Sequence, residues 1–211
     1  WALAAGLPLP PQEYDAIQPP VPSVAVNISS PALYAYVRGK VLLQGSAAGA
    51  GFRFYQLQAG QGLNPLEWLQ AAPDGSQPVQ NGVLGEWDTS GLDGLYALRL
   101  LVVRQDQTVE TSIVQVTVDN RAPLAHLTYP VAGQSFLARE QASLTFQAEV
   151  SDNLRVARVV WLVDGREVGE TVQAPYAFTW TPKAGTHTLQ IKAYDPAGNE
   201  GLSDEISFDL Q

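Results

Sequence analysis

The chain has 211 residues and a formal net charge of −9, with 12 Lys and Arg against 21 Asp and Glu, and it contains no Cys. The acidic balance argues against nucleic-acid binding, which needs a surplus of Lys and Arg along one face. The absence of Cys excludes disulfides, thiolate metal sites and a Cys nucleophile.

Residues 1–22 form a proline-rich leader, WALAAGLPLPPQEYDAIQPPVP. Proline fixes the backbone and removes a hydrogen-bond donor, so an extended connector is favoured over a helix or a central strand. Residues such as Trp1 and Leu9 are too apolar for a freely solvated linker. We therefore expect part of the leader to lie against the first domain or against a preceding domain of a longer protein.

The start of the chain also bears on its origin. It has no Met and no signal-peptide pattern, and no apolar run reaches the length of a membrane span. We expect the chain to be a piece of a longer protein, with no membrane span in this fragment.

From Val24 onward the apolar residues alternate with a period of two, which predicts half-buried antiparallel strands. SLTFQAEV (143–150) places four apolar residues on one face, and TLQIKA (188–193) and EISFDL (205–210) place three each. Turn signals such as Asn81-Gly82, Asp93-Gly94 and Asp164-Gly165 separate the segments.

The strand pattern occurs twice in the same order. NISSP (27–31) matches HLTYP (126–130), FRFYQLQAG (52–60) matches ARVVWLVDG (157–165), and the segment containing Trp87 matches the one containing Trp180. Each copy offers about seven short strands, the number in an immunoglobulin-like sandwich. We predict an all-β chain of two tandem immunoglobulin-like β-sandwich domains, 23–121 and 122–211, held end to end by a short linker and preceded by the leader 1–22.

Polar residues gather where the loops of the second copy should meet the linker: Asp119, Asn120, Asp152, Asn153, Asp195 and Asn199. Asp and Asn are ordinary turn formers that bond to their own backbone, so we predict no metal or cofactor. The alternative is a calcium ion, which takes six to eight oxygen ligands and would suit converging carboxylates and amides.

The segment SDN, residues 151–153, matches one of three motifs of penicillin-recognising enzymes, which also need S-x-x-K and K-T-G. The sequence contains no S-x-x-K, and its nearest approach to K-T-G is Lys183-Ala184-Gly185 in a predicted turn. We therefore predict no catalytic residue and assign SDN to a strand end and turn.

Four tryptophans raise the alternative of carbohydrate stacking. Trp87 and Trp180 occupy matching positions of the repeat, and Trp161 lies on a predicted third strand, so these three are expected in cores. Trp68 in NPLEWLQ has no counterpart in the second copy. It is the tryptophan we assign to a possible binding surface.

The leader together with YQLQAGQGLNPLEWLQ (55–70) and VQVTVDNRAP (114–123) resembles the C-terminal extension of bacterial bifunctional penicillin-binding proteins, which are membrane-anchored peptidoglycan glycosyltransferase/transpeptidases. Residues 126–201 resemble the bacterial immunoglobulin-like modules of exported proteins. The family's catalytic motifs are missing, so none of its catalytic residues carries over.

The resemblance implies a non-catalytic, extracytoplasmic accessory module of a membrane-anchored cell-wall enzyme, in contact with peptidoglycan or a cell-envelope protein. The alternative is a mechanical spacer or adhesin-type segment of another exported protein. An exposed aromatic or apolar surface would favour the first function, and an evenly polar exterior with a stiff joint would favour the second.

Overall fold

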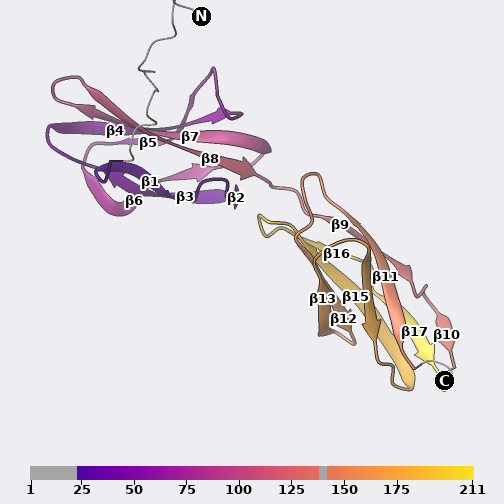
Figure 1. Cartoon of the computed structure of the whole chain (residues 1–211). Helices are drawn as coiled ribbons and strands as arrows, with labels where there is room; N and C mark the ends of the chain where they lie inside the picture. Colours follow the sequence, from indigo (N-terminus) through magenta and orange to yellow (C-terminus); the bar gives the residue numbers. More distant parts are fainter. Residues whose placement is uncertain (1–22, 138–141) are drawn as a thin grey trace, which may run out of the picture.

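The computed structural model describes residues 23–137 and 142–211, which form strands and loops (Figure 1). The expected packing of the leader, 1–22, lies outside the described residues. No helix in the described ranges has the length and hydrophobicity that crossing a bilayer requires.

Residues 23–121 form two sheets that face each other. A three-stranded sheet has the order β1-β3-β6, and a five-stranded sheet has the order β2-β8-β7-β4-β5. The strands are β1 (Val26–Ser30), β2 (Tyr36–Val37), β3 (Lys40–Ala47), β4 (Phe52–Gln61), β5 (Leu69–Gly75), β6 (Val79–Asp88), β7 (Gly94–Arg104) and β8 (Val109–Val118).

Residues 122–211 repeat this arrangement. The order β14-β11-β9 makes one sheet and β10-β17-β15-β12-β13 the other, with β16 added to β15. The strands are β9 (Leu124–Tyr129), β10 (Gln134–Phe136), β11 (Leu144–Ser151), β12 (Arg158–Val163), β13 (Arg166–Thr171), β14 (Tyr176–Trp180), β15 (Gly185–Tyr194), β16 (Glu200–Leu202) and β17 (Ile206–Leu210).

The two halves share one topology. In each, the first strand pairs antiparallel in one sheet, β1 with β3 and β9 with β11. The chain then crosses to the other sheet, where β2 pairs in parallel with β8 and β10 in parallel with β17. Two facing sheets with these connections make each half an immunoglobulin-like sandwich, and the chain is all β.

Each sandwich has its own core, built from the inward faces of its alternating strands. In the first core Leu43, Leu57 and Leu100 are fully buried, and in the second Phe146 and Trp161 are. The alternation predicted for β15 is confirmed, because Leu189, Ile191 and Ala193 are all 0% exposed. Burial of these faces removes apolar surface from water and is the main stabilising contribution.

One aromatic pair recurs in both cores. Trp87 on β6 meets Tyr96 on β7 edge to face at 5.7 Å between ring centroids. Trp180 on β14 meets His187 on β15 in the same way at 5.0 Å. The strands that carry these rings are the matching strands of the two halves, so the repeat seen in the sequence is also a repeat of packing.

Candidate functional site

The linker between the sandwiches is bonded firmly to the first one. Asn120 accepts a hydrogen bond from the Gly39 amide at 2.8 Å, and its side-chain amide donates to the carbonyls of Thr89 at 2.8 Å and Leu92 at 3.0 Å. One side chain therefore joins the linker to two loops of the first sandwich. Hydrogen bonds in three directions leave Asn120 little freedom to rotate.

Other bonds cross from one sandwich to the other. Asn199, which is buried, donates to the main-chain carbonyl of Asp119 at 2.9 Å and accepts from the Arg38 guanidinium at 3.2 Å. Asn153 lies 3.4 Å from both carboxylate oxygens of Asp93. The first sandwich and the loops of the second therefore share one polar network, and the two halves lie end to end at this joint (Figure 1).

The backbone of the linker also packs closely against the second sandwich. Gly201 on β16 lies so close to the linker that a Cβ added to it would stand 1.8 Å from the carbonyl oxygen of Pro123. Only glycine permits that approach without displacing the linker. The linker is thus held between β16 and the loops of the first sandwich.

Three carboxylates converge inside the joint. Asp119 follows β8, Asp152 follows β11 and Asp195 follows β15, and each presents an oxygen within 4.8 Å of the other two. Asp119 is 0% exposed and Asp195 is 3% exposed. Within the described ranges, no Lys or Arg forms an ion pair with any of the three.

Asp195 uses both oxygens, since Oδ1 accepts from the main-chain amide of Asn199 at 2.9 Å and Oδ2 accepts from its side-chain amide at 2.5 Å, whereas Asp152 and Asp119 each use one oxygen to bond their own loop. Asp152 Oδ1 accepts from the amides of Leu154 and Arg155, both at 2.8 Å, and Asp119 Oδ1 accepts from the Arg121 amide at 3.2 Å. The other oxygen, Oδ2, is buried without a hydrogen-bond donor in both residues. These are the only two such side-chain atoms among the described residues.

The surroundings change the pKa of Asp119. Its burial raises the pKa of this carboxyl above the ordinary value, the Arg121 amide opposes that change, and the charges of Asp195, Asp152 and Asp93 raise the pKa further. Burial and like charges both disfavour an ionised carboxyl. An ionised Asp119 is therefore costly in the joint as the described side chains leave it.

The six residues considered for calcium separate into two groups. The three Asp side chains come together, whereas the amides of Asn120, Asn153 and Asn199 act as donors in the network described above. Asn120 faces the first sandwich and not the carboxylates. Asp and Asn looked equivalent in the sequence because both are turn formers, and only the pairing of the loops distinguishes them.

The SDN segment is distant from the lysine that would have to assist it. Ser151 ends β11 at the joint, whereas Lys183 precedes β15 at the opposite end of the same sandwich. Because β15 spans ten residues, the two ends are separated by about 30 Å at about 3.3 Å per residue. Lys183 is therefore too far from Ser151 to assist it, and Asp152 belongs to the carboxylate cluster.

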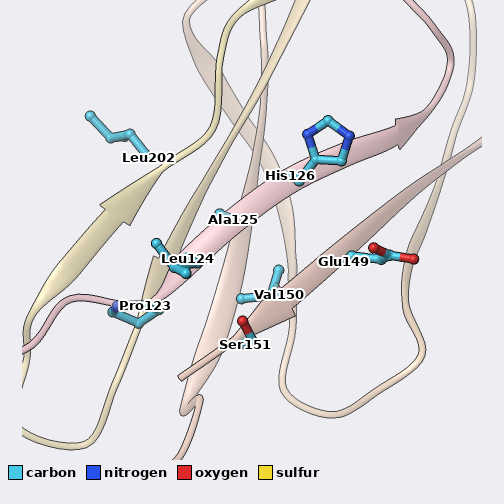
Figure 2. Close-up of a pocket in the computed structure, with 8 residues that line it drawn as sticks. All are labelled: Pro123, Leu124, Ala125, His126, Glu149, Val150, Ser151 and Leu202. Carbon is cyan, nitrogen blue, oxygen red and sulfur yellow. The ribbon is translucent and has the colours of Figure 1, made fainter. Parts of the chain in front are cut away.

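A shallow hollow beside the joint is lined by Ser151, His126 and Glu149, residue types that can form a hydrolytic triad (Figure 2). Glu149 lies opposite His126 in the β11–β9 register, and Ser151 lies opposite Leu124, two residues from His126. Such diagonal neighbours are about 7–8 Å apart. A triad needs the nucleophile within hydrogen-bond reach of its base, and among the described residues no hydrogen bond joins Ser151 to His126.

Trp68 lies half-buried beside the five-stranded sheet of the first sandwich. The Arg99 guanidinium sits 4.0 Å from the centre of its ring, and Arg99 also donates to Gln58 at 3.0 Å. Cation–π contact and this hydrogen bond fix the indole in place. Leu66 and Leu69, close to Trp68 in the sequence, are 100% and 73% exposed.

A family model described as "Bacterial Ig domain" matches residues 123–191, most of the second sandwich. Comparison of the sequence with curated proteins found no match. The family match and the structure agree on the fold of residues 123–191.

Solved structures resemble the whole arrangement. The FN1–FN3 domains of chicken CNTN1 align with a TM-score of 0.51 and 13% identity, over 88% of this chain and 64% of that one. Fibronectin(III)-like modules of Clostridium thermocellum CbhA align with a TM-score of 0.49 and 20% identity, over 87% and 93%. A bacterial ice-binding adhesin aligns at 0.43 and 13% identity, over 88% and 64%. The CNTN1 likeness supports the tandem sandwich fold and nothing finer.

Proposed function

We propose that this chain is a non-catalytic, extracytoplasmic segment of a bacterial exported protein, and that it works as a stiff spacer. The observation that carries the proposal is the joint, in which Asn120 bonds the linker to the first sandwich while Asn199 bonds the second sandwich to Asp119. A flexible connector would leave such groups to water. The bacterial immunoglobulin match of residues 123–191 supports an exported parent.

Distance measurement between two spin labels tests the stiffness. The chain has no Cys, so Ser76→Cys and Ala184→Cys place labels at exposed positions far from the joint, one on each sandwich. We expect one narrow distance distribution. A broad distribution, of the width given by two bodies that rotate freely about a linker, would contradict a spacer function.

A matched pair of variants tests whether hydrogen bonds at the joint cause the narrow distance distribution. Asn120→Ala removes the side-chain bonds to Gly39, Thr89 and Leu92 of the first sandwich and should broaden the distribution. Asn153→Ala removes only the exposed 3.4 Å contacts with Asp93 and should leave the width nearly unchanged. Equal widths for both variants would mean that Asn120 does not fix the joint.

A second function is favoured by the exposed leucines that flank Trp68 in the sequence. Exposed leucines beside a fixed indole suit contact with peptidoglycan sugars or with an envelope protein. On this proposal the segment is an accessory module of a membrane-anchored penicillin-binding protein, supported by the resemblance of residues 55–70 and 114–123. Retention on purified peptidoglycan that is lost in Trp68→Ala, but kept in the control Leu124→Ala, is the expected result. If peptidoglycan does not retain the unaltered chain, the binding function is contradicted and only the spacer function remains.

A further inference from the structure

The carboxylate cluster at the joint contains a buried acid that the protein leaves unsatisfied. Asp119 is 0% exposed, and its Oδ2 has no hydrogen-bond donor although Oδ1 is bonded to the Arg121 amide. A buried charge without a partner is costly, and folded proteins normally pair such groups or use them to bind an ion. One carboxylate oxygen of Asp119 lies within 4.8 Å of an oxygen from each of Asp152 and Asp195.

Asp152 adds a second unsatisfied oxygen to the same place. Its Oδ1 is held by the amides of Leu154 and Arg155, which fixes the direction of the carboxylate and leaves the buried Oδ2 free of donors. Asp195 supplies the third oxygen and is oriented through the Asn199 amide at 2.9 Å. Three loops therefore present preoriented oxygens to one point.

From this arrangement we propose that the joint binds a calcium ion through Asp119, Asp152 and Asp195. Oxygen atoms that contact one calcium at about 2.4 Å can lie at most about 4.8 Å apart, and the three ligand atoms meet that limit. The ion supplies positive charge where the described Lys and Arg residues provide none. It also brings positive charge to the two carboxylates whose Oδ2 atoms are buried without a donor.

The chemistry of the donors selects calcium among common metal ions. All three donors are carboxylate oxygens, with no His or Cys, which disfavours zinc and copper. Magnesium needs shorter bonds in a near-ideal octahedron, whereas calcium accepts irregular sets of six to eight oxygens that include water. Loops from two different sandwiches make an irregular set of this kind.

The site connects the sandwiches as well as binding an ion. Asp119 belongs to the end of the first sandwich, whereas Asp152 and Asp195 belong to loops of the second. A bound ion would be a further link across the joint. The inference does not depend on the spacer function, because metal binding is measured without reference to what the segment does.

Calorimetric titration and thermal unfolding of the whole chain, after treatment with chelator, test the proposal. Calcium should bind with a single-site isotherm and, at about 100 times its Kd, raise the melting temperature by at least about 5 °C. Magnesium at the same concentration should produce less than a tenth of the binding. Absence of calcium heat and of any melting shift would overturn the site, and equal binding of magnesium would overturn the assignment to calcium.

Asp152→Asn is the decisive variant, since an Asn oxygen can still accept the Leu154 and Arg155 amides while the charged Oδ2 is lost. We expect calcium affinity to fall at least tenfold. Asp106→Asn is the matched control, because Asp106 likewise accepts a turn amide, that of Thr108, but lies at the turn between β7 and β8. Unchanged affinity in Asp152→Asn would place the ion elsewhere and overturn the proposal.

Asp152→Asn also distinguishes stabilisation by a bound ion from the relief of charge repulsion among the three carboxylates. If no ion binds, Asp152→Asn should raise the melting temperature equally with and without calcium, because it removes one of three like charges. If the ion binds, the variant should be more stable than the unaltered chain in chelator and lose the calcium-induced rise. Circular dichroism of Asp152→Asn confirms that the comparison is between folded proteins.

Discussion

Aspartates in turns of this protein form the same local hydrogen bond in very different surroundings. Asp106 and Asp119 each accept an amide from two positions further along the chain, at 3.0 Å and 3.2 Å. Asp106 is exposed, whereas Asp119 is buried with an unsatisfied oxygen. The local hydrogen bond is of the same kind, so the difference reflects which loops the fold brings together.

Gly201→Ala tests the packing of the linker against β16. A Cβ at this position would collide with the backbone of Pro123. Because the obstructing atoms belong to the backbone, no side-chain movement can relieve the collision. We expect a loss of about 1–3 kcal/mol in the stability of the second sandwich, as for other overpacked sites. Urea unfolding followed by Trp fluorescence measures the loss.

Gly82→Ala is the control for that substitution. Its Cβ would meet a Val79 methyl group at 3.1 Å, a contact that a small side-chain movement relieves. It should cost clearly less than Gly201→Ala. Equal losses in both variants would mean that the close approach of Pro123 is not what makes Gly201 necessary.

Asp164 gives the second sandwich a dependence on pH. Burial would raise the pKa of this carboxyl, but hydrogen bonds from the His187 ring at 2.8 Å and the Thr188 amide at 2.9 Å lower the pKa below its ordinary value. A lowered folded-state pKa gives stability that is present above the unfolded pKa of about 3.9 and is lost as the pH falls through the folded value.

Asp164→Asn should therefore flatten the acid side of the stability profile. Between pH 5 and pH 2 the variant is expected to lose less stability than the unaltered chain, as measured by urea midpoints at each pH. Identical slopes would show that the pKa of Asp164 is the same in the folded and unfolded states.

At the scale of strands, periodicity predicted the long elements well. Apolar residues at alternate positions of β11 and β15 face the second core as expected, and Phe146 is fully buried. The short strands β2 and β10 were not predicted, because two or three residues carry no readable period. Their parallel pairing with β8 and β17 depends on partners far away in the sequence.

The polar groups at the joint were predictable only in part. Sandwich topology places the loops after β11 and β15 at the same end, so their convergence with the linker could be expected. Which side chain turns inward could not be predicted, because this depends on hydrogen bonds such as that of Asn120 to Thr89 in the first sandwich. The position of Trp68 beneath Arg99 likewise depends on a contact between residues 31 positions apart, which periodicity does not encode.

We propose that residues 23–121 and 122–211 are separate folding units, since each has its own core. Leu43→Ala should lower the stability of the first unit by about 2–5 kcal/mol, and Phe146→Ala that of the second by about 3–5 kcal/mol. Differential scanning calorimetry should show each variant shifting one transition by much more than the other. A single transition that shifts equally in both variants would contradict two units.

At the scale of the molecule, the contacts at the joint restrict how the two sandwiches can move relative to each other. Hydrogen bonds from Asn199 and Asn120, and the approach of Gly201 to Pro123, restrict the linker from both sides. A stiff pair transmits position and orientation along its length, which a chain of freely jointed domains does not. The carboxylates inside the joint would make that stiffness depend on calcium.

Residual dipolar couplings of backbone amides, recorded over both sandwiches in one weakly aligned sample with calcium present, test the fixed joint most directly. The couplings of residues 23–121 and 122–211 should fit a single alignment tensor, of the same magnitude and direction, with the domain orientation of Figure 1. Two tensors of clearly different magnitude would show that the sandwiches move independently, and would contradict the account.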